Sequence, residues 1–208
     1  MQLDDLSFDV LHPEPLLVVI SGPSGVGKDS VVKALKERNY PMHFVVTATS
    51  RPPRPGEVNG VDYFFMSKQE FEQMIASDEL IEHSLVYNDY KGIPKRQIRE
   101  ALASGKDTIL RLDVQGAIKV RKLCPEAVMI FILPHDADEW YRRLANRNTE
   151  TPENLQRRLS AARDEMNQLD VFDYLVINAE NCLDQAVESI IQILSAEHHR
   201  HPHRKISI

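Results

Sequence analysis

A glycine-rich segment near the start of the chain has the residue types that hold a polyphosphate. Residues 22–28 read Gly-Pro-Ser-Gly-Val-Gly-Lys and fit the first seven positions of the pattern G-x-x-x-x-G-K-[ST]. The glycines let the backbone curl so that successive N–H groups point inward, and the start of a following helix adds positive potential. Lys28 is then placed to offset the charge that builds on a transferred phosphoryl group. An ordinary glycine-rich turn is the alternative, although such a turn has no need of a lysine here.

The position after Lys28 departs from this pattern. Ser or Thr is expected there, because its hydroxyl helps to hold magnesium, but the chain has Asp29 followed by Ser30. One hypothesis is that Asp29 binds magnesium directly or through water, since carboxylate oxygen suits this ion. A second is that the loop no longer supports catalysis, because a carboxylate beside a triphosphate adds repulsion. An Asp29→Ser variant separates them, since a large gain in turnover would contradict the first.

A second segment, residues 49–65, combines arginines with prolines and a tyrosine. Arg51 and Arg54 carry planar, permanently charged forks that suit a phosphate monoester, and Tyr63 adds a hydroxyl donor. Prolines between the arginines stiffen the segment and lower the entropy cost of presenting them. A solvated loop or an extended peptide ligand is the alternative, but the neighbouring phosphate loop argues against it.

The elements that position these segments are predicted from apolar runs. Residues 16–20 are continuously apolar and lead into the glycine loop, which predicts a central parallel strand, and residues 28–38 have helical apolar spacing. Four more strands are predicted at Phe44–Ala48, Thr108–Val114, Val128–Leu133 and Tyr174–Ile177. Strands that alternate with helices indicate an α/β fold with a five-stranded parallel sheet flanked by helices.

Two inserts interrupt this alternation. Residues 49–106 are rich in Pro, Gly and Tyr at first and helix-like from Ser67 onward, which is more typical of a substrate-binding subdomain than of a loop. Residues 141–168 are dense in arginine, have a helix-start signal at Thr151-Pro152-Glu153, and are expected to form a mobile lid. The core is then assigned to residues 15–48, 107–140 and 169–197.

Both ends are expected to be flexible. Residues 1–14 precede the first predicted strand, and residues 198–208 are histidine-rich. Histidines could bind a metal ion there, but we expect a frayed, solvated tail.

Composition excludes several classes of protein. A net charge of -6 over 208 residues argues against a nucleic-acid-binding protein, and the longest apolar runs are too short to span a bilayer. Two cysteines without metal-ligand spacing suit a reducing compartment, and the first fifteen residues are acidic, unlike a targeting leader. We therefore expect a cytoplasmic monomer or homodimer that contacts neither nucleic acid nor membrane.

The segment Thr-Ser-Arg-Pro-Pro-Arg-Pro-Gly-Glu-Val-Asn-Gly-Val-Asp-Tyr-Phe-Phe at residues 49–65 resembles the GMP-binding segment of guanylate kinases. Further similar segments extend the resemblance from about residue 16 to residue 195; they include Glu82, residues 113–116, residues 143–150 and residues 158–160. The set looks closest to plastid-like guanylate kinases. The resemblance implies a P-loop NTPase fold with an inserted GMP-binding subdomain and a helical lid. It also implies transfer of the γ-phosphoryl group of ATP to GMP and dGMP, with magnesium entering with ATP.

The resemblance also assigns roles to residues. The catalytic residues would be Lys28, Arg51, Arg143, Arg147 and Arg158. The ATP-binding residues would be Gly22, Pro23, Ser24, Gly25, Val26, Gly27, Lys28, Asp29 and Ser30. The GMP-binding residues would be Thr47, Arg51, Arg54, Glu57, Tyr63, Glu82, Tyr90 and Asp113, and the metal ligands would be Asp29 and Asp113. Glu82 would accept hydrogen bonds from N1–H and N2–H of guanine. Asp113 could instead only cap a helix, and the arginines from residue 143 onward could line a solvated helix face.

Three positions depart from the family. Lys91 and Ile93 stand where members carry a tyrosine and a hydroxyl, so either Lys91 supplies a charge instead or Tyr90 swings in. Arg111 replaces an aspartate and could donate to guanine O6 or N7, or pair with a neighbouring carboxylate.

Two other functions stay open. A non-catalytic guanylate-kinase-like module would bind a phosphopeptide through the same arginines, but such modules usually lack the full glycine loop. A related kinase would act on another phosphorylated metabolite, a possibility that Arg111 raises.

Overall fold

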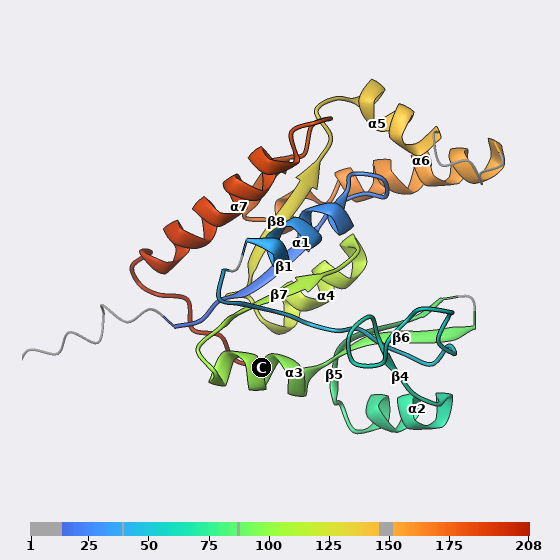
Figure 1. Cartoon of the computed structure of the whole chain (residues 1–208), viewed down its shortest axis with the longest axis vertical. Helices are drawn as coiled ribbons and strands as arrows, with labels where there is room; N and C mark the ends of the chain where they lie inside the picture. The colour runs from blue at the N-terminus through green and yellow to red at the C-terminus, as the bar shows by residue number, and fades with distance from the viewer. Residues whose placement is uncertain (1–13, 39, 87, 146–151) are drawn as a thin grey trace, which may run out of the picture.

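The computed structural model describes residues 14–38, 40–86, 88–145 and 152–208. Five strands form one sheet in the order β2-β7-β1-β8-β9, and every neighbouring pair is parallel. The strands are β1 (Leu17–Ser21), β2 (Met42–Phe44), β7 (Asp107–Arg111), β8 (Val128–Leu133) and β9 (Tyr174–Ile177). The predicted α/β fold with a five-stranded parallel sheet is confirmed (Figure 1).

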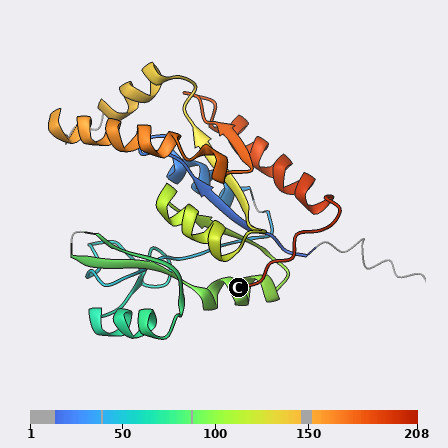
Figure 2. The same cartoon turned by 180° about the vertical axis from the view of Figure 1, so that it is seen from behind.

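The sheet is covered by helices on both faces (Figures 1 and 2). On one face, Val18 and Ile20 pack with the apolar sides of α1 (Lys28–Glu37) and α7 (Leu183–His198). On the other face, Leu17 and Val19 pack with α3 (Lys95–Ala103) and α4 (Val114–Leu123). Burial of β1 on both faces explains why its sequence is continuously apolar rather than alternating.

The expectation of a single strand at residues 44–48 is wrong. β2 ends at Phe44, whereas β3 (Ala48–Thr49) belongs to a second sheet of order β4-β3-β6-β5. Between them, the side-chain amide of Gln97 accepts from the Val46 N–H at 3.0 Å and donates to the Val46 carbonyl at 2.7 Å. The apolar run therefore passes from the five-stranded sheet to the second sheet instead of forming one strand. The spacing of apolar residues does not indicate where a chain leaves one sheet for another.

The second sheet lies in the insert. Its other strands are β4 (Phe64–Phe65), β5 (Leu80–Val86) and β6 (Asp89–Pro94), and helix α2 (Lys68–Ala76) packs on it through Phe71. The side chain of Ser67 caps α2 and Glu70 bonds back to the Ser67 N–H, which confirms a helix start there. The prediction that the insert is helix-like from Ser67 onward is wrong for residues 80–94. These residues form the antiparallel β5–β6 hairpin.

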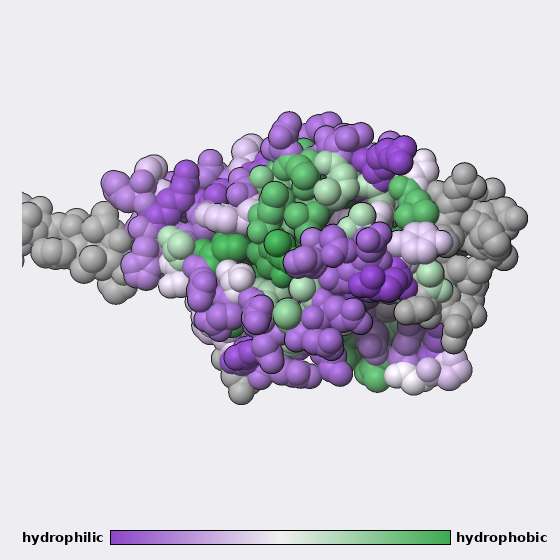
Figure 3. All heavy atoms as spheres, turned by 90° about the horizontal axis from the view of Figure 1, so that it is seen from above, coloured by the Kyte–Doolittle hydropathy of each residue, from purple (hydrophilic) through white to green (hydrophobic). Residues whose placement is uncertain are grey.

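Helices α5 (Ala137–Ala145) and α6 (Pro152–Met166) extend outward from the end of the sheet at which β8 finishes (Figure 1). The predicted helix start at Pro152 is confirmed. A 3₁₀ turn, η3 (Leu169–Val171), follows before β9. The face seen from above is mostly hydrophilic around one apolar patch (Figure 3). Within the described residues, no helix is long and apolar enough to cross a membrane.

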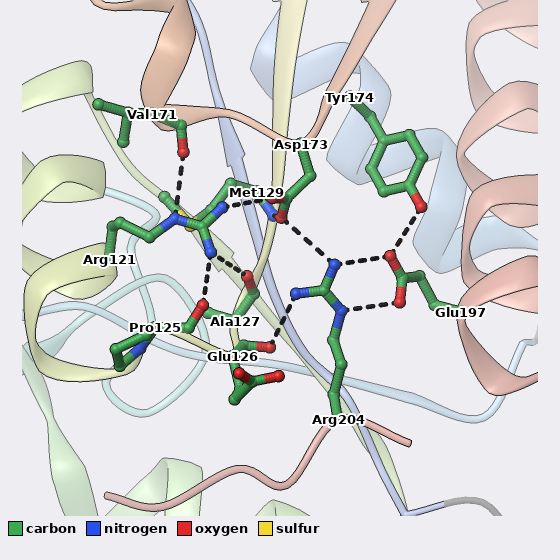
Figure 4. Close-up of polar contacts among 10 residues, drawn as sticks. All are labelled: Arg121, Pro125, Glu126, Ala127, Met129, Val171, Asp173, Tyr174, Glu197 and Arg204. Atoms are coloured by element: carbon green, nitrogen blue, oxygen red, sulfur yellow. Dashed lines mark hydrogen bonds and ion pairs between the residues drawn. The ribbon is translucent and has the colours of Figure 1, made fainter. Parts of the chain in front are cut away.

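The expectation of a solvated C-terminal tail is wrong at Arg204, Ile206 and Ile208. Arg204 is 9% exposed, and Ile206 and Ile208 pack against the core beneath the sheet. Arg204 donates to both carboxylate oxygens of Glu197, at 2.7 and 2.8 Å (Figure 4). No group of residues suited to a metal ion is found in the described part of the chain, histidines of this tail included. The segment predicted at residues 1–14 lies outside the described residues except for Glu14.

Candidate functional site

The glycine loop connects β1 to α1, and its Gly22, Gly25 and Gly27 all have the positive φ that favours glycine. Gly22 has φ 141°, and a Cβ atom there would lie 2.4 Å from the carbonyl oxygen of Ile132. Gly27 has φ 88°, and a Cβ atom would lie 2.6 Å from Nδ2 of Asn178. Positive φ and close approach to a neighbouring strand therefore explain the glycine spacing.

Side chains from the end of the sheet and from α5 hold this loop. Nδ2 of Asn178 donates to the Val26 carbonyl at 2.8 Å, and the indole N–H of Trp140 donates to the Ser24 carbonyl at 2.8 Å. The ammonium of Lys28 lies over the loop and donates to the carbonyls of Gly22 and Pro23 at 2.5 and 2.9 Å. The loop is thereby fixed with its lysine folded back over it, as a phosphate cradle requires.

A cavity of about 340 Å³ lies between this loop and the insert. Its lining joins residues that are far apart in the sequence: Lys28, Asp29, Thr47, Tyr63, Glu82, Ser84, Lys91, Ile93, Arg111, Leu112 and Asp113. Lys28 and Asp113 come from the core, while Tyr63, Glu82 and Lys91 come from the insert. The structure therefore brings six of the predicted site residues to one place: Lys28, Asp29, Thr47, Tyr63, Glu82 and Asp113.

Arg51 stands beside this cavity with its guanidinium already oriented. Both carboxylate oxygens of Glu57 accept from it, at 2.7 and 2.6 Å, and the Arg54 N–H donates to Glu57 at 2.7 Å. The hydrogen bond from Arg51, with the backbone bond, lowers the pKa of Glu57 to about 2. The Arg51 guanidinium also lies 4.8 Å from the ring centre of Tyr63 and 5.5 Å from that of Phe65.

Lys91 adds a second cation to the insert side. Its Nζ lies 5.8 Å from the ring centre of Tyr63. Lys91 itself stands at the position where the family resemblance led us to expect a tyrosine. Tyr90 does not line the cavity: its ring stacks with Phe71 at 5.2 Å, and its hydroxyl donates to Glu72 at 3.2 Å. Of the two alternatives for the lost tyrosine, the structure favours the charge of Lys91 over a turn of Tyr90.

Glu82, on β5 of the insert, lines the cavity. Its side chain is 11% exposed, and Nζ of Lys119, from α4, lies 3.3 Å from its Oε2. Burial raises the pKa of Glu82, and the Lys119 ammonium opposes that rise. Lys119 also donates to the His83 carbonyl at 2.7 Å, so it ties the hairpin to the core. Lys119 and Ser84 are contacts of this site that sequence reasoning missed, because neither lies in a recognisable motif.

The two carboxylates proposed as metal ligands are both engaged. Oδ1 of Asp113 accepts from the Gly116 N–H at 2.8 Å, so the helix-cap alternative is correct for that oxygen. Asp29 forms an ion pair with Arg111, the last residue of β7. Arg111 therefore pairs with a neighbouring carboxylate, which was the second alternative for this residue.

The arginines assigned to the lid are placed unevenly. Arg143 lies on α5, pairs with Glu139, and has its Nη1 3.5 Å from the Val26 carbonyl of the glycine loop. Arg147 lies outside the described residues, and Arg158 lies in α6 with a side chain that is also outside them. Glu165 of α6 was not foreseen; burial raises its pKa, with smaller and opposed influences from Lys28 and Asp113.

Comparisons with known proteins agree with this geometry. The family model described as guanylate kinase matches residues 14–197. A protein named guanylate kinase 2, chloroplastic/mitochondrial, from Oryza sativa subsp. japonica is 48% identical over 197 residues, 94% of this chain and 69% of that protein. A guanylate kinase from Gloeobacter violaceus is 44% identical over 186 residues, 89% of this chain and 90% of that protein. The crystal structure of guanylate kinase from Anaplasma phagocytophilum matches with a TM-score of 0.72 at 28% identity, over 92% of this chain and 90% of that one.

Proposed function

The chain belongs to the guanylate kinase family, and we propose that its central cavity carries out that family's reaction, transfer of the γ-phosphoryl group of ATP to GMP. The observation that supports this most is the shared lining of the cavity. Lys28 at the end of the glycine loop and Glu82 and Tyr63 from the insert border the same space. Phosphoryl transfer between two nucleotides needs no covalent intermediate, but it needs two polyanions held in line.

The donor nucleotide is assigned to the glycine loop. The backbone N–H groups of Gly22 and of residues 24–27, together with the start of α1, would hold the β- and γ-phosphates of ATP; Pro23 has no N–H to donate. Lys28 would move from the loop carbonyls to the phosphates and offset the charge that builds on the transferred group. The anchors from Asn178 and Trp140 keep the loop in shape for this exchange.

The acceptor nucleotide is assigned to the insert. Arg51 and Lys91, which both lie near the Tyr63 ring, would hold the phosphate of GMP, with the Tyr63 hydroxyl as a further donor. Arg54 is exposed and would join them. Glu82 would accept from N1–H and N2–H of guanine, and Thr47, which lines the same cavity, would contact the base edge. Because these contacts involve no 2′-hydroxyl, we expect dGMP to be accepted too.

Magnesium is proposed to enter with ATP. Of the two predicted carboxylate ligands, Asp113 fits better. Its Oδ1 accepts a hydrogen bond from the Gly116 N–H, whereas its Oδ2 has no hydrogen-bond partner among the described residues and is left for an ion. Oxygen ligands of this kind suit magnesium or its bound water. Asp29 fits less well, because Arg111 already neutralises it. The ion would neutralise phosphate oxygens during transfer.

Exclusion of water is assigned to α5 and α6. An open site would let water compete with GMP, so closure over the phosphates is expected. Arg143 already lies beside the loop, and Arg147 and Arg158 keep the role that the family resemblance gives them as a prediction.

We further propose that the protein works in the cytoplasm as a monomer or homodimer, without a nucleic-acid or membrane partner. Both cysteines are free, as expected in a reducing compartment.

A coupled assay of ADP formation tests the proposed function. ATP is supplied with GMP, AMP, UMP or CMP, and we expect strong preference for GMP. Similar use of several acceptors would contradict the role of Glu82. If no ADP forms with any of the four acceptors, the non-catalytic phosphopeptide-binding module is favoured. If ADP forms only with another phosphorylated metabolite, a related kinase is favoured.

A further inference from the structure

Asp29 creates an electrostatic difficulty for a phosphate-binding loop. It follows Lys28 directly, in the first turn of α1, where the loop pattern has a hydroxyl. A carboxylate at this position would repel the triphosphate that the loop is built to hold. Its side chain is 75% exposed, so burial does not neutralise it.

Arg111 removes this difficulty from the neighbouring strand. β7 runs parallel to β1, and Arg111 is in register with Ile20, just before the glycine loop. From there its guanidinium reaches across the loop's base and pairs with the carboxylate of Asp29. The pair therefore links β7, the strand beside β1, to α1, the helix after the loop.

The pair also lies where two cavities meet. Asp29 and Arg111 line the cavity shared by the loop and the insert, and both also line a second cavity of about 260 Å³. That second cavity is bounded by Lys33 and Lys36 of α1 and by Val61 of the insert. Arg111 is 42% exposed in its side chain, so its charge acts on these spaces as well as on Asp29.

We propose that Asp29 and Arg111 form one compensating unit, in which Arg111 is a positioning residue that neutralises Asp29 so that the loop accepts ATP. This proposal rests on the proposed function. It adds Arg111, the last residue of β7, to the residues that serve the ATP site. It makes a specific prediction: Arg111 is needed only while residue 29 is an aspartate. A guanine-reading role for Arg111 would instead act on GMP, whatever residue stands at position 29.

A double-mutant cycle tests the unit. In Arg111→Gln, the unpaired carboxylate should raise KM for ATP about tenfold, with less than about a twofold change in KM for GMP. Asp29→Ser supplies the second background, because it removes the carboxylate; Arg111→Gln added to it should change KM for ATP by less than about twofold. Arg111→Lys keeps a positive charge and should recover most of the ATP affinity.

A matched control comes from Arg38 and Asp184, another ion pair that involves α1. It has the same arginine exposure, 42%, and a carboxylate that is 88% exposed, at 2.8 Å. Arg38→Gln should change neither KM. Thermal unfolding of each variant shows whether it is folded, and Arg111→Met, which also removes the charge, replaces Arg111→Gln if the latter is not.

An Arg111→Gln effect of the same size in both backgrounds would overturn the unit, and so would an effect confined to KM for GMP. Absence of any effect of Arg111→Gln would overturn it too. Calorimetric binding of ADP with magnesium repeats the cycle without phosphoryl transfer. If the unaltered protein does not use GMP, the proposed function fails while ADP binding still decides whether the unit exists.

Discussion

Arg204 and Arg51 each hold a glutamate through both arms of the guanidinium, but their surroundings differ. Arg204 and Glu197 are 10% and 1% exposed in their side chains, and further bonds run to Glu126 and Tyr174 (Figure 4). Arg51 and Glu57 lie at the edge of the central cavity, against the Tyr63 ring. The same kind of ion pair therefore fixes a segment in the first case, and in the second it orients the cation that we propose binds the phosphate of GMP.

The Arg204 pair belongs to a larger network beneath the sheet. Asp173 accepts from the Met129 N–H at 2.9 Å, pairs with Arg121 at 2.7 Å, and lies 3.6 Å from Arg204. Arg121 in turn donates to the carbonyls of Pro125, Ala127 and Val171. Nearly every polar atom here has a partner, which makes a buried network stabilising rather than costly. Changes in this region should affect folding, whereas changes at the cavity should affect turnover.

Lys28→Met is expected to have the largest effect. Loss of the ammonium that offsets charge on the transferred group should lower kcat about 10³-fold, with little change in unfolding. Steady-state kinetics and thermal unfolding measure both. A fall in kcat of less than about tenfold would place the charge stabilisation elsewhere.

Arg204→Met should show the opposite behaviour. It leaves the Glu197 carboxylate buried without its cation, so the free energy of unfolding should fall by about 3 kcal/mol. Urea unfolding measures this loss, and kcat of the folded fraction should not change. Arg204→Met combined with Glu197→Leu should recover part of it, because both charges are then gone.

A matched control for the Arg204 variant is the pair of Lys95 and Asp78, 2.7 Å apart, in which the lysine side chain is 14% exposed but the carboxylate is 87% exposed. Lys95→Met should change the free energy of unfolding by less than about 1 kcal/mol. If Lys95→Met and Arg204→Met lower the free energy of unfolding by equal amounts, burial of the carboxylate does not set the difference between these pairs.

Arg51→Lys sharpens the comparison on the cavity side. Lysine keeps the charge but cannot hold Glu57 and a phosphate with a planar fork, so KM for GMP should rise about 20-fold. KM for ATP should change little, and the unfolding transition should stay in place. A rise in KM for ATP instead would assign Arg51 to the donor nucleotide.

The smallest effect concerns pH. Burial and the hydrogen bond to Glu197 raise the pKa of Tyr174 to about 12 from its usual 10.0. Because the folded state holds this proton more tightly, the contribution is complete below pH 10 and is lost as pH rises toward 12. Unfolding measured from pH 8 to pH 12 should show this fall, and Tyr174→Phe should lack that part of it. An identical profile in the variant would contradict the assignment.

The comparison also shows what sequence could predict. The glycine loop, the strands at 128–133 and 174–177 and the start of α6 follow from local patterns, and the structure has them at those positions. Pairing partners of charged side chains do not follow from local patterns. The Asp29–Arg111 pair and the Glu197–Arg204 pair depend on which strands lie side by side and where the last residues turn back. For this reason the histidine-rich end was expected to be solvated, whereas Arg204 is buried there.

One binding measurement tests the central claim most directly, namely that the loop of Lys28 and the clamp of Arg51 serve one cavity. The probe is an adenosine and a guanosine joined through five phosphates, titrated by calorimetry against ADP and GMP separately. If both nucleotide sites lie in one cavity, the joined compound should bind at least about 100-fold more tightly than either alone, because its second half binds at high effective concentration. Lys28→Met and Arg51→Lys should each weaken it. An affinity no better than that of ADP, unchanged in Arg51→Lys, would contradict the account.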